Sequence, residues 1–174
     1  MDDHGFVANA SSQSLVLVTY TALPRNPNQA FGKSKTKFAI FSKPAAGRRN
    51  SRGLQLSVLV VDDVADVTEM IALFLKHAGY NVSTADSATA ALQLARERTF
   101  DLIISDIGMP DMDGHQLAES LRTLSDYRSS PIIALTGFPE YDDRGRALQA
   151  GFNAHLTKPI EPSQLLGLIH ELLK

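Results

Sequence analysis

Residues 54–174 alternate between short apolar runs and longer stretches in which apolar residues recur at helical spacing. Short aliphatic and β-branched runs predict buried strands, and an alternation of apolar and polar residues predicts an edge strand. Three runs predict buried strands, and the alternating residues 81–85 predict an edge strand. A fifth and last strand is predicted to run to Lys158. The first four predicted strands cover residues 58–61, 81–85, 102–104 and 131–135.

A helix is predicted after each of these strands. In the first helix Val67, Ile71 and Leu75 recur at helical spacing, and Gly79 is suited to end it, because glycine adopts the left-handed conformation common after a helix. Ser87 is suited to cap the second helix with its hydroxyl. The five predicted helices cover residues 67–75, 88–95, 116–121, 144–150 and 162–173.

This order of elements predicts an α/β fold. Five strand–helix repeats with apolar strands indicate a parallel sheet covered by helices on both faces. Right-handed crossovers leave few topologies for such a chain. We expect a flavodoxin-like, doubly wound (βα)5 sheet with the strand order 2-1-3-4-5, which places the edge-like second strand at an edge.

Residues 1–53 have a different character. They show no sustained periodicity and contain eight Lys or Arg against two Asp, a net charge of +6, whereas residues 54–174 contain nine against seventeen, a net charge of −8. This break predicts a domain boundary. We expect residues 1–53 to be a basic, disordered tail, apart from a short strand over residues 15–20. A solvated tail is favoured over a targeting peptide or a nucleic-acid-binding arm, so nucleic acid is an unlikely partner.

Composition excludes several classes of protein. There is no Cys, which rules out disulfides, thiolate metal sites and a cysteine nucleophile. No apolar run approaches the ~20 residues that span a bilayer. Asp2 and Asp3 are negative where a secretory signal is positive. We therefore expect a cytoplasmic protein without a membrane partner.

Chemically useful residues follow four of the five predicted strands. They are Asp62 and Asp63, Asp106, Thr136, and Lys158. In the order 2-1-3-4-5 these four strands are neighbours, and in open parallel sheets ligands bind outside the carboxyl ends of the strands. Each residue alone is more often structural, but their joint placement predicts one shared site.

The residue types at this site indicate phosphoryl transfer. Three carboxylates repel one another unless a cation lies between them, and oxygen ligands suit a mostly hydrated Mg²⁺. Asp106 lies between the acidic pair and Lys158, which suits a nucleophile that forms an aspartyl phosphate. Lys158 and Thr136 could then neutralise or bind phosphoryl oxygens, since catalysis of this kind is mainly positioning and charge neutralisation.

The acidic loop at residues 111–114 is not a calcium-binding EF-hand. With Gly114 in the sixth position, Met109 and Ser120 would stand where acidic ligands are needed. The loop is therefore a turn into the third helix. His115 and His170 have no partner at metal-ligand spacing, and we expect both at the surface.

Four stretches closely resemble the motifs of the response-regulator receiver family of two-component signalling. These are residues 60–63, 106–114, 134–137 and 156–159. The resemblance covers roughly residues 56–174 and none of the tail. It implies the flavodoxin-like fold expected above and a switch that is phosphorylated in a phosphorelay.

The resemblance also implies a magnesium site. Asp63 and Asp106 would bind Mg²⁺ directly, together with the main-chain carbonyl of Gly108, and Asp62 would act through water. Asp106 would be the phosphoacceptor.

Further roles are implied for the phosphoryl group and for switching. Thr136 and Lys158 would contact the phosphoryl group, the Lys158–Pro159 peptide would be cis, and phosphorylation would draw Thr136 inward. Family members often carry Tyr or Phe three residues before this lysine, where this chain has His155. Histidine there is familiar in receivers attached to hybrid sensor kinases, and its imidazole would take the place of the inward-moving ring.

The resemblance implies partners as well. The phosphodonor would be a sensor histidine kinase or a histidine phosphotransfer protein, and the output a downstream protein target. Because no output domain follows Lys158, we expect a stand-alone receiver that can form a homodimer through the face of the fourth helix, fifth strand and fifth helix. It would not be an enzyme beyond catalysing its own phosphorylation and dephosphorylation.

Other functions compete with this one. The chain could be a phosphate sink or the receiver of a hybrid kinase. A Mg²⁺-dependent phosphohydrolase of the haloacid-dehalogenase type is a remote alternative, because that class has two Asp separated by one residue after its first strand, where this chain reads Asp62-Asp63-Val64.

Overall fold

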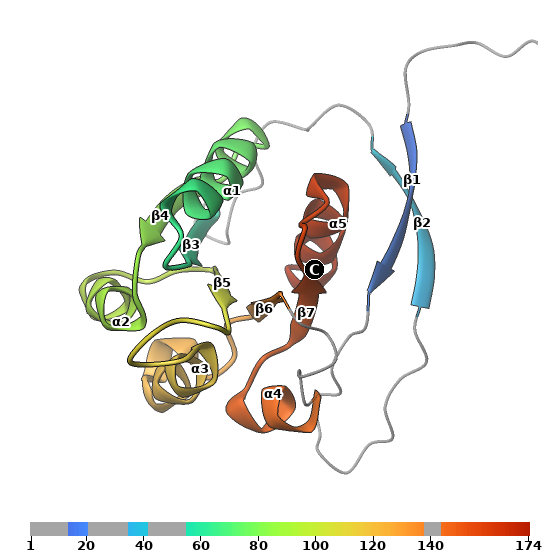
Figure 1. Ribbon diagram of the computed structural model, residues 1–174. Coiled ribbons are helices and arrows are strands. Elements are labelled where there is room, and N and C mark those ends of the chain that lie inside the picture. The colour runs from blue at the N-terminus through green and yellow to red at the C-terminus, as the bar shows by residue number, and fades with distance from the viewer. Residues whose placement is uncertain (1–13, 21–34, 42–54, 138–143) are drawn as a thin grey trace, which may run out of the picture.

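The main domain is built around one parallel sheet of five strands. The computed structural model describes residues 14–20, 35–41, 55–137 and 144–174 (Figure 1). The sheet contains β3 (Ser57–Val61), β4 (Asn81–Ala85), β5 (Leu102–Asp106), β6 (Ile132–Thr136) and β7 (Ala154–Thr157). Their spatial order is β4-β3-β5-β6-β7, with every neighbouring pair parallel. Counted from β3, this is the predicted order 2-1-3-4-5.

Helices cover both faces of this sheet. They are α1 (Ala65–His77), α2 (Ala88–Glu97), α3 (Gly114–Thr123), α4 (Arg144–Ala150) and α5 (Pro162–Leu172), with a 3-10 turn at Ser125–Tyr127 after α3. Apolar residues of α1 and α5 pack on one face, and those of α2, α3 and α4 pack on the other. The five predicted helices and the doubly wound fold class are therefore confirmed.

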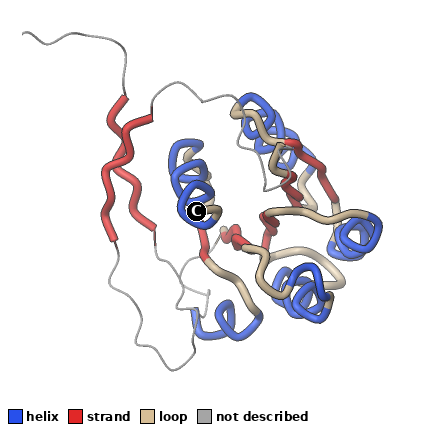
Figure 2. Tube along the Cα trace, turned by 180° about the vertical axis from the view of Figure 1, so that it is seen from behind, coloured by secondary structure: helices blue, strands red, loops and turns tan. Residues whose placement is uncertain are grey.

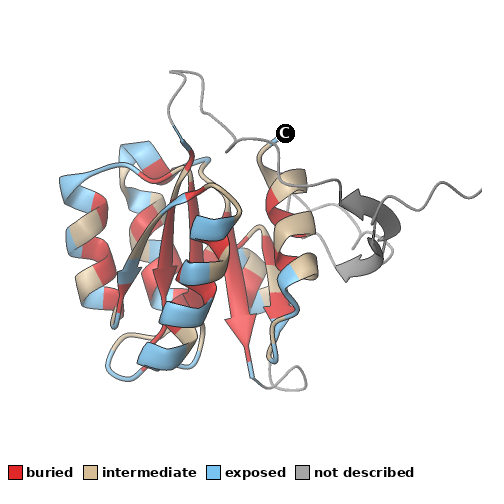
Figure 3. Cartoon of the chain, turned by 90° about the horizontal axis from the view of Figure 1, so that it is seen from above, coloured by how far each residue is buried: buried red, intermediate tan, exposed pale blue. Residues whose placement is uncertain are grey.

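The central strands contribute to both hydrophobic cores. In β6, Ile132 and Ala134 face α2, α3 and α4, whereas Ile133 and Leu135 face α1 and α5. All four are fully buried between the helical layers (Figure 3), and burying each large aliphatic side chain contributes about 1.5–3 kcal/mol. This two-sided burial explains the uninterrupted apolar run, while the edge strand β4 is largely half-buried or exposed and alternates in sequence.

Local interactions mark the start of α2 and the end of α1 at the residues that the sequence predicts. The Ser87 hydroxyl accepts a hydrogen bond from the Ala90 N–H at 3.3 Å at the start of α2. After α1, Gly79 has a φ of 91°, its N–H donates to the Lys76 carbonyl, and the Tyr80 N–H donates to the Leu75 carbonyl. This pair of bonds is the Schellman motif, which satisfies carbonyls left unpaired at a helix end.

The N-terminal segment contributes two further strands. β1 (Ser14–Tyr20) includes the strand predicted at residues 15–20, and it pairs antiparallel with β2 (Lys35–Phe41), which the sequence did not indicate. The pairing of these strands is a contact between residues far apart in the chain, so no local pattern marks it. The predicted disorder of residues 1–13, 21–34 and 42–53 lies outside the described residues.

Within the described part of the chain, no helix is both long and apolar enough to cross a membrane.

Arg122 joins the far end of α3 to two loops. Its Nε donates to the Gly151 carbonyl at 3.0 Å, and its Nη1 donates to the carbonyls of Tyr127 and, at 2.7 Å, Ser130. Its Nη2 donates to Asn153 Oδ1 at 2.8 Å. Burial lowers the pKa of this guanidinium from its usual value. The guanidinium of Arg122 thus connects α3 by hydrogen bonds to the turn after it and to the turn between α4 and β7.

We expect Arg122→Lys to lower the free energy of unfolding by about 1–3 kcal/mol, because an ammonium cannot satisfy several carbonyls with the geometry of a guanidinium. Urea denaturation measures this loss. The matched control is Arg128→Lys at an exposed position in the same turn, where a change within about 0.5 kcal/mol is expected. Equal effects of the two substitutions would contradict the anchoring role of Arg122.

Candidate functional site

The candidate site lies where four strands end at the same edge of the sheet. Asp62 follows β3, Asp106 ends β5, Thr136 ends β6, and Lys158 follows β7. These strands are consecutive neighbours in the sheet. The predicted convergence of the four strand ends is therefore present.

Lys158 connects the two buried carboxylates of this edge. Its Nζ lies 2.6 Å from Asp62 Oδ2 and 2.7 Å from Asp106 Oδ1. Asp62 is 0% exposed and Asp106 is 5% exposed, whereas the Lys158 side chain is 26% exposed. Without a cation, two carboxylates this well removed from water would repel each other strongly. The ammonium group is the cation that compensates them.

The pKa of Lys158 reflects these opposing influences. Burial by itself lowers this pKa, but hydrogen bonds to Asp106 and Asp62 and the attraction of both carboxylates raise it, and the net pKa lies above its usual value. Lys158 therefore carries its charge across the physiological range.

Backbone interactions hold Lys158 and Asp62 in place. The Lys158 N–H donates to the Thr136 carbonyl at 2.8 Å, and the Lys158–Pro159 peptide is cis, as predicted. The second oxygen of Asp62, Oδ1, accepts a hydrogen bond from the Val64 N–H at 3.0 Å. Both carboxylate oxygens of Asp62 are thus engaged by the protein itself.

The loop after Asp106 passes close to that residue. A Cβ atom on Gly108 would lie 3.4 Å from Asp106 Oδ2, so the main chain of Gly108 lies beside the oxygen that does not contact Lys158. A Cβ atom on Gly114 would lie 2.2 Å from the Asp106 carbonyl oxygen, so a side chain at 114 would push the loop away. Asp111 turns the loop with a φ of 63°.

The other predicted site residues lie on the strands and loops of the same sheet. Asp63 is exposed at the start of α1, and Thr136 is buried at the end of β6. A Cβ atom on Gly137, next to Thr136, would meet no atom of the described residues within 4 Å. His155 is half-buried on β7, in register with Ala134 of β6. It therefore lies on the strand that leads to Lys158.

The donor set suits a partly hydrated hard cation. Among the described residues, no three acidic or histidine side chains are grouped so as to enclose a metal, which argues against a closed protein cage. The Gly108 main chain lies beside Asp106 Oδ2, and the exposed Asp63 follows the neighbouring strand β3 at the same edge of the sheet. Mg²⁺ needs only one or two carboxylates because it keeps several waters. These oxygen donors fit Mg²⁺.

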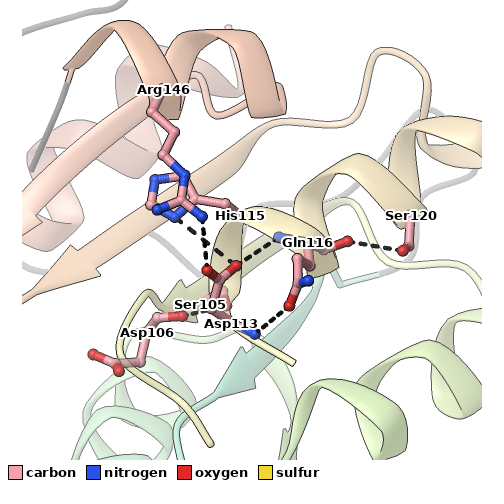
Figure 4. A network of polar contacts seen from close by, with 7 residues as sticks. All are labelled: Ser105, Asp106, Asp113, His115, Gln116, Ser120 and Arg146. Atoms are coloured by element: carbon pink, nitrogen blue, oxygen red, sulfur yellow. Dashed lines mark hydrogen bonds and ion pairs between the residues drawn. The ribbon is translucent and has the colours of Figure 1, made fainter. Parts of the chain in front are cut away.

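A polar network at the start of α3 was not predicted (Figure 4). Asp113 caps the helix, since its Oδ1 accepts a hydrogen bond from the Gln116 N–H at 2.8 Å, and its Oδ2 pairs with Arg146 of α4 at 3.0 Å. The network links the loop after Asp106 to α4. The helical start at residue 114 was visible in sequence, but an ion pair between separate helices has no local signal.

The surface position predicted for His115 is wrong. His115 is only 5% exposed, and its ring lies perpendicular to that of Phe152 with centroids 5.8 Å apart. Its position three residues before the buried Ala118 could have indicated this, because residues three apart share a helix face. His170 is half-buried on α5.

Comparisons with known proteins identify the family to which this domain is similar. Residues 58–170 match the family model described as the response regulator receiver domain. An uncharacterised 14.6 kDa protein of Leptolyngbya boryana is 38% identical over 117 residues, which cover 67% of this chain and 89% of that protein. Several other curated relatives are matched over only 52–57% of their length.

Solved structures resemble the domain as well. The chemotaxis protein CheY4 of Vibrio cholerae is 35% identical with a TM-score of 0.66, over 68% of this chain and 98% of that one. The receiver domain of the sensor histidine kinase PA1611 of Pseudomonas aeruginosa is 30% identical with a TM-score of 0.64, over 68% and 97%. The PA1611 structure has a magnesium ion coordinated in its active-site cleft.

We expect Lys158→Met to lower the free energy of unfolding by about 2–4 kcal/mol at pH 7 in the presence of a chelator, because two buried carboxylates lose their cation. Since the pKa of Lys158 is raised on folding, its contribution is fully present below the unfolded-state value of about 10.4. It is lost as the pH rises through the higher folded-state pKa. Denaturant unfolding of both proteins from pH 7 to 11.5 measures the difference.

The control for this measurement is Lys76→Met, at an exposed position of α1, which should change stability by less than about 0.5 kcal/mol. A stability difference between wild type and Lys158→Met that already shrinks between pH 8 and 10 would contradict the assigned ion pairs.

Proposed function

The chain belongs to the response-regulator receiver family of two-component phosphorelay signalling, and on that premise we propose that residues 54–174 accept a phosphoryl group on Asp106 in a Mg²⁺-dependent reaction. The single observation that carries the proposal is the state of the Asp106 carboxylate. It is buried at the ligand-binding edge of the sheet, with Oδ1 on Lys158 and Oδ2 beside the Gly108 main chain.

The proposed magnesium ligands follow from which oxygens the protein leaves available. Asp106, the exposed Asp63 and the Gly108 carbonyl would bind the ion directly. Asp62 would act through water, because Lys158 and the Val64 N–H already hold its two oxygens. The bound ion would supply positive charge to offset that of the transferred phosphoryl group.

Phosphorylation would proceed by attack of the Asp106 carboxylate on the phosphorus of a phosphohistidine. The P–N bond breaks, the donor imidazole leaves, and an acyl phosphate forms on Asp106. The Lys158 ammonium lies within reach of an oxygen on the new phosphoryl group, because it already contacts Asp106 Oδ1 at 2.7 Å. The Thr136 hydroxyl would bind another oxygen. The donor would approach beside Gly137, where a Cβ atom would meet none of the described residues within 4 Å.

Switching would begin at Thr136 and continue along β7. Drawing Thr136 toward the phosphoryl group would leave space on the same side of the sheet as α4. His155 lies on that side, because it alternates with Ala154 and Leu156, which pack toward α1 and α5. Its imidazole is the side chain we propose moves inward. The change would reach a downstream protein through α4, β7 and α5, the face that would also support a homodimer.

The donor would be a sensor histidine kinase or a histidine phosphotransfer protein in the cytoplasm. The chain would catalyse only its own phosphorylation and dephosphorylation. A second candidate is the receiver of a hybrid kinase, which the similarity to the PA1611 receiver and the presence of His155 favour. Both candidates use the same site.

Incubation with acetyl phosphate and Mg²⁺ should add one phosphoryl group that hydroxylamine removes, and Asp106→Asn should abolish this addition. Intact-protein mass spectrometry measures it. The control is Asp111→Asn, in the same loop but exposed, which should be labelled at the wild-type level. Labelling of Asp106→Asn at that level, or labelling unaffected by a chelator, would refute the proposed site. Continuous release of phosphate would instead favour a phosphohydrolase.

A further inference from the structure

The outer side of α5 is covered by another part of the protein. Residues 163–173 are all buried or half-buried. In α1, by contrast, exposed residues recur along the outer side, among them Asp66, Glu69, Leu73 and Lys76. A helix that packs on one face of a sheet normally buries one stripe and exposes the other. Packing on the sheet therefore does not by itself account for the burial of the outer side of α5.

β1 is the element that lies on this outer side. It runs along α5 and also approaches β7, at the edge of the sheet opposite β4 (Figures 1 and 2). β1 is paired with β2 along its whole length, from Ser14 opposite Phe41 to Tyr20 opposite Lys35. The two strands thus form one antiparallel unit, which we call the N-terminal hairpin, and this unit lies against the α5 side of the domain.

The composition of α5 suits a covered helix. Leu165, Leu168 and Ile169 are buried against the sheet. Leu166, Leu172 and Leu173 are half-buried and pack at the margin of the same core. The apolar side of α5 is therefore wide, and it extends beyond the residues that are fully buried against the sheet.

Charge favours a partner from within this chain. Residues 1–53 carry a net charge of +6 and residues 54–174 a net charge of −8. Opposite net charges on segments of one chain attract each other at ordinary ionic strength, whereas two copies of the acidic domain repel each other.

We propose that the N-terminal hairpin is the intramolecular partner of the α5–β7 surface. The hairpin occupies the side on which a second copy of the domain would pair through β7 and α5, so it and a second copy compete for one surface. This role does not depend on phosphorylation of Asp106.

The test measures amide hydrogen exchange of α5 in the full chain and in a variant with Val16→Pro and Leu17→Pro. Successive strand residues point their N–H groups to opposite edges, so one of the two prolines removes a hydrogen bond between β1 and β2. Asn26→Pro, between the two strands, is the control. We expect exchange in α5 to be faster by on the order of tenfold in the double variant and unchanged in the control.

Protection of α5 in the wild-type chain should be the same at low and high protein concentration. Protection that rises with concentration would assign the surface to a second copy and overturn the proposal, and so would unchanged α5 exchange in the double variant. Exchange in α1 reports whether the domain stays folded. Because no readout uses phosphorylation, failure of this proposal is separate from failure of the proposed function.

Discussion

The site depends on burying two carboxylates at the ends of neighbouring strands. Asp62 and Asp106 are almost completely removed from water, and Lys158 is the cation that contacts both. Neighbouring strands are about 4.8 Å apart, so β7 lies about 10 Å from β5. The extended side chain of Lys158 and the carboxylate of Asp106 can together span that distance. The sheet order β3-β5-β6-β7 is therefore a condition for the ion pairs.

The residues that stabilise the fold and the residues proposed to bind ligands lie in different parts of the sheet. Strands β5 and β6 are buried on both sides along their whole length, so the positions of Asp106 and Thr136 are set by a rigid core. Other groups proposed to bind the ion, Asp63 and the Gly108 carbonyl, lie in the loops beyond the strand ends. Among the described residues, Lys158 is the one cation that contacts the two buried carboxylates, which leaves a preference for a further cation. A divalent cation would offset the remaining negative charge.

The start of α3 connects this edge to α4, and its two polar interactions differ in strength. The capping box formed by Asp113 and Gln116 satisfies backbone N–H groups on both sides and is worth about 1 kcal/mol. The Asp113–Arg146 ion pair is partly exposed and contributes about 0.2–1 kcal/mol. The cap thus holds the helix start, whereas the ion pair contributes little to holding α4 in place.

The sequence by itself determined the order of strands and helices, the helix ends at Ser87 and Gly79, and the strand ends that meet at the site. These features follow from local patterns and from the few topologies open to a parallel sheet. Tertiary structure alone decided that Asp62, rather than its neighbour Asp63, holds Lys158, and that His115 is buried. It also decided the pairing of β1 with β2 and the loops that Arg122 joins. The physical reason is distance along the chain: Lys158 and Asp62 are 96 residues apart, and adjacent aspartates look alike until folding turns one inward and leaves the other in water.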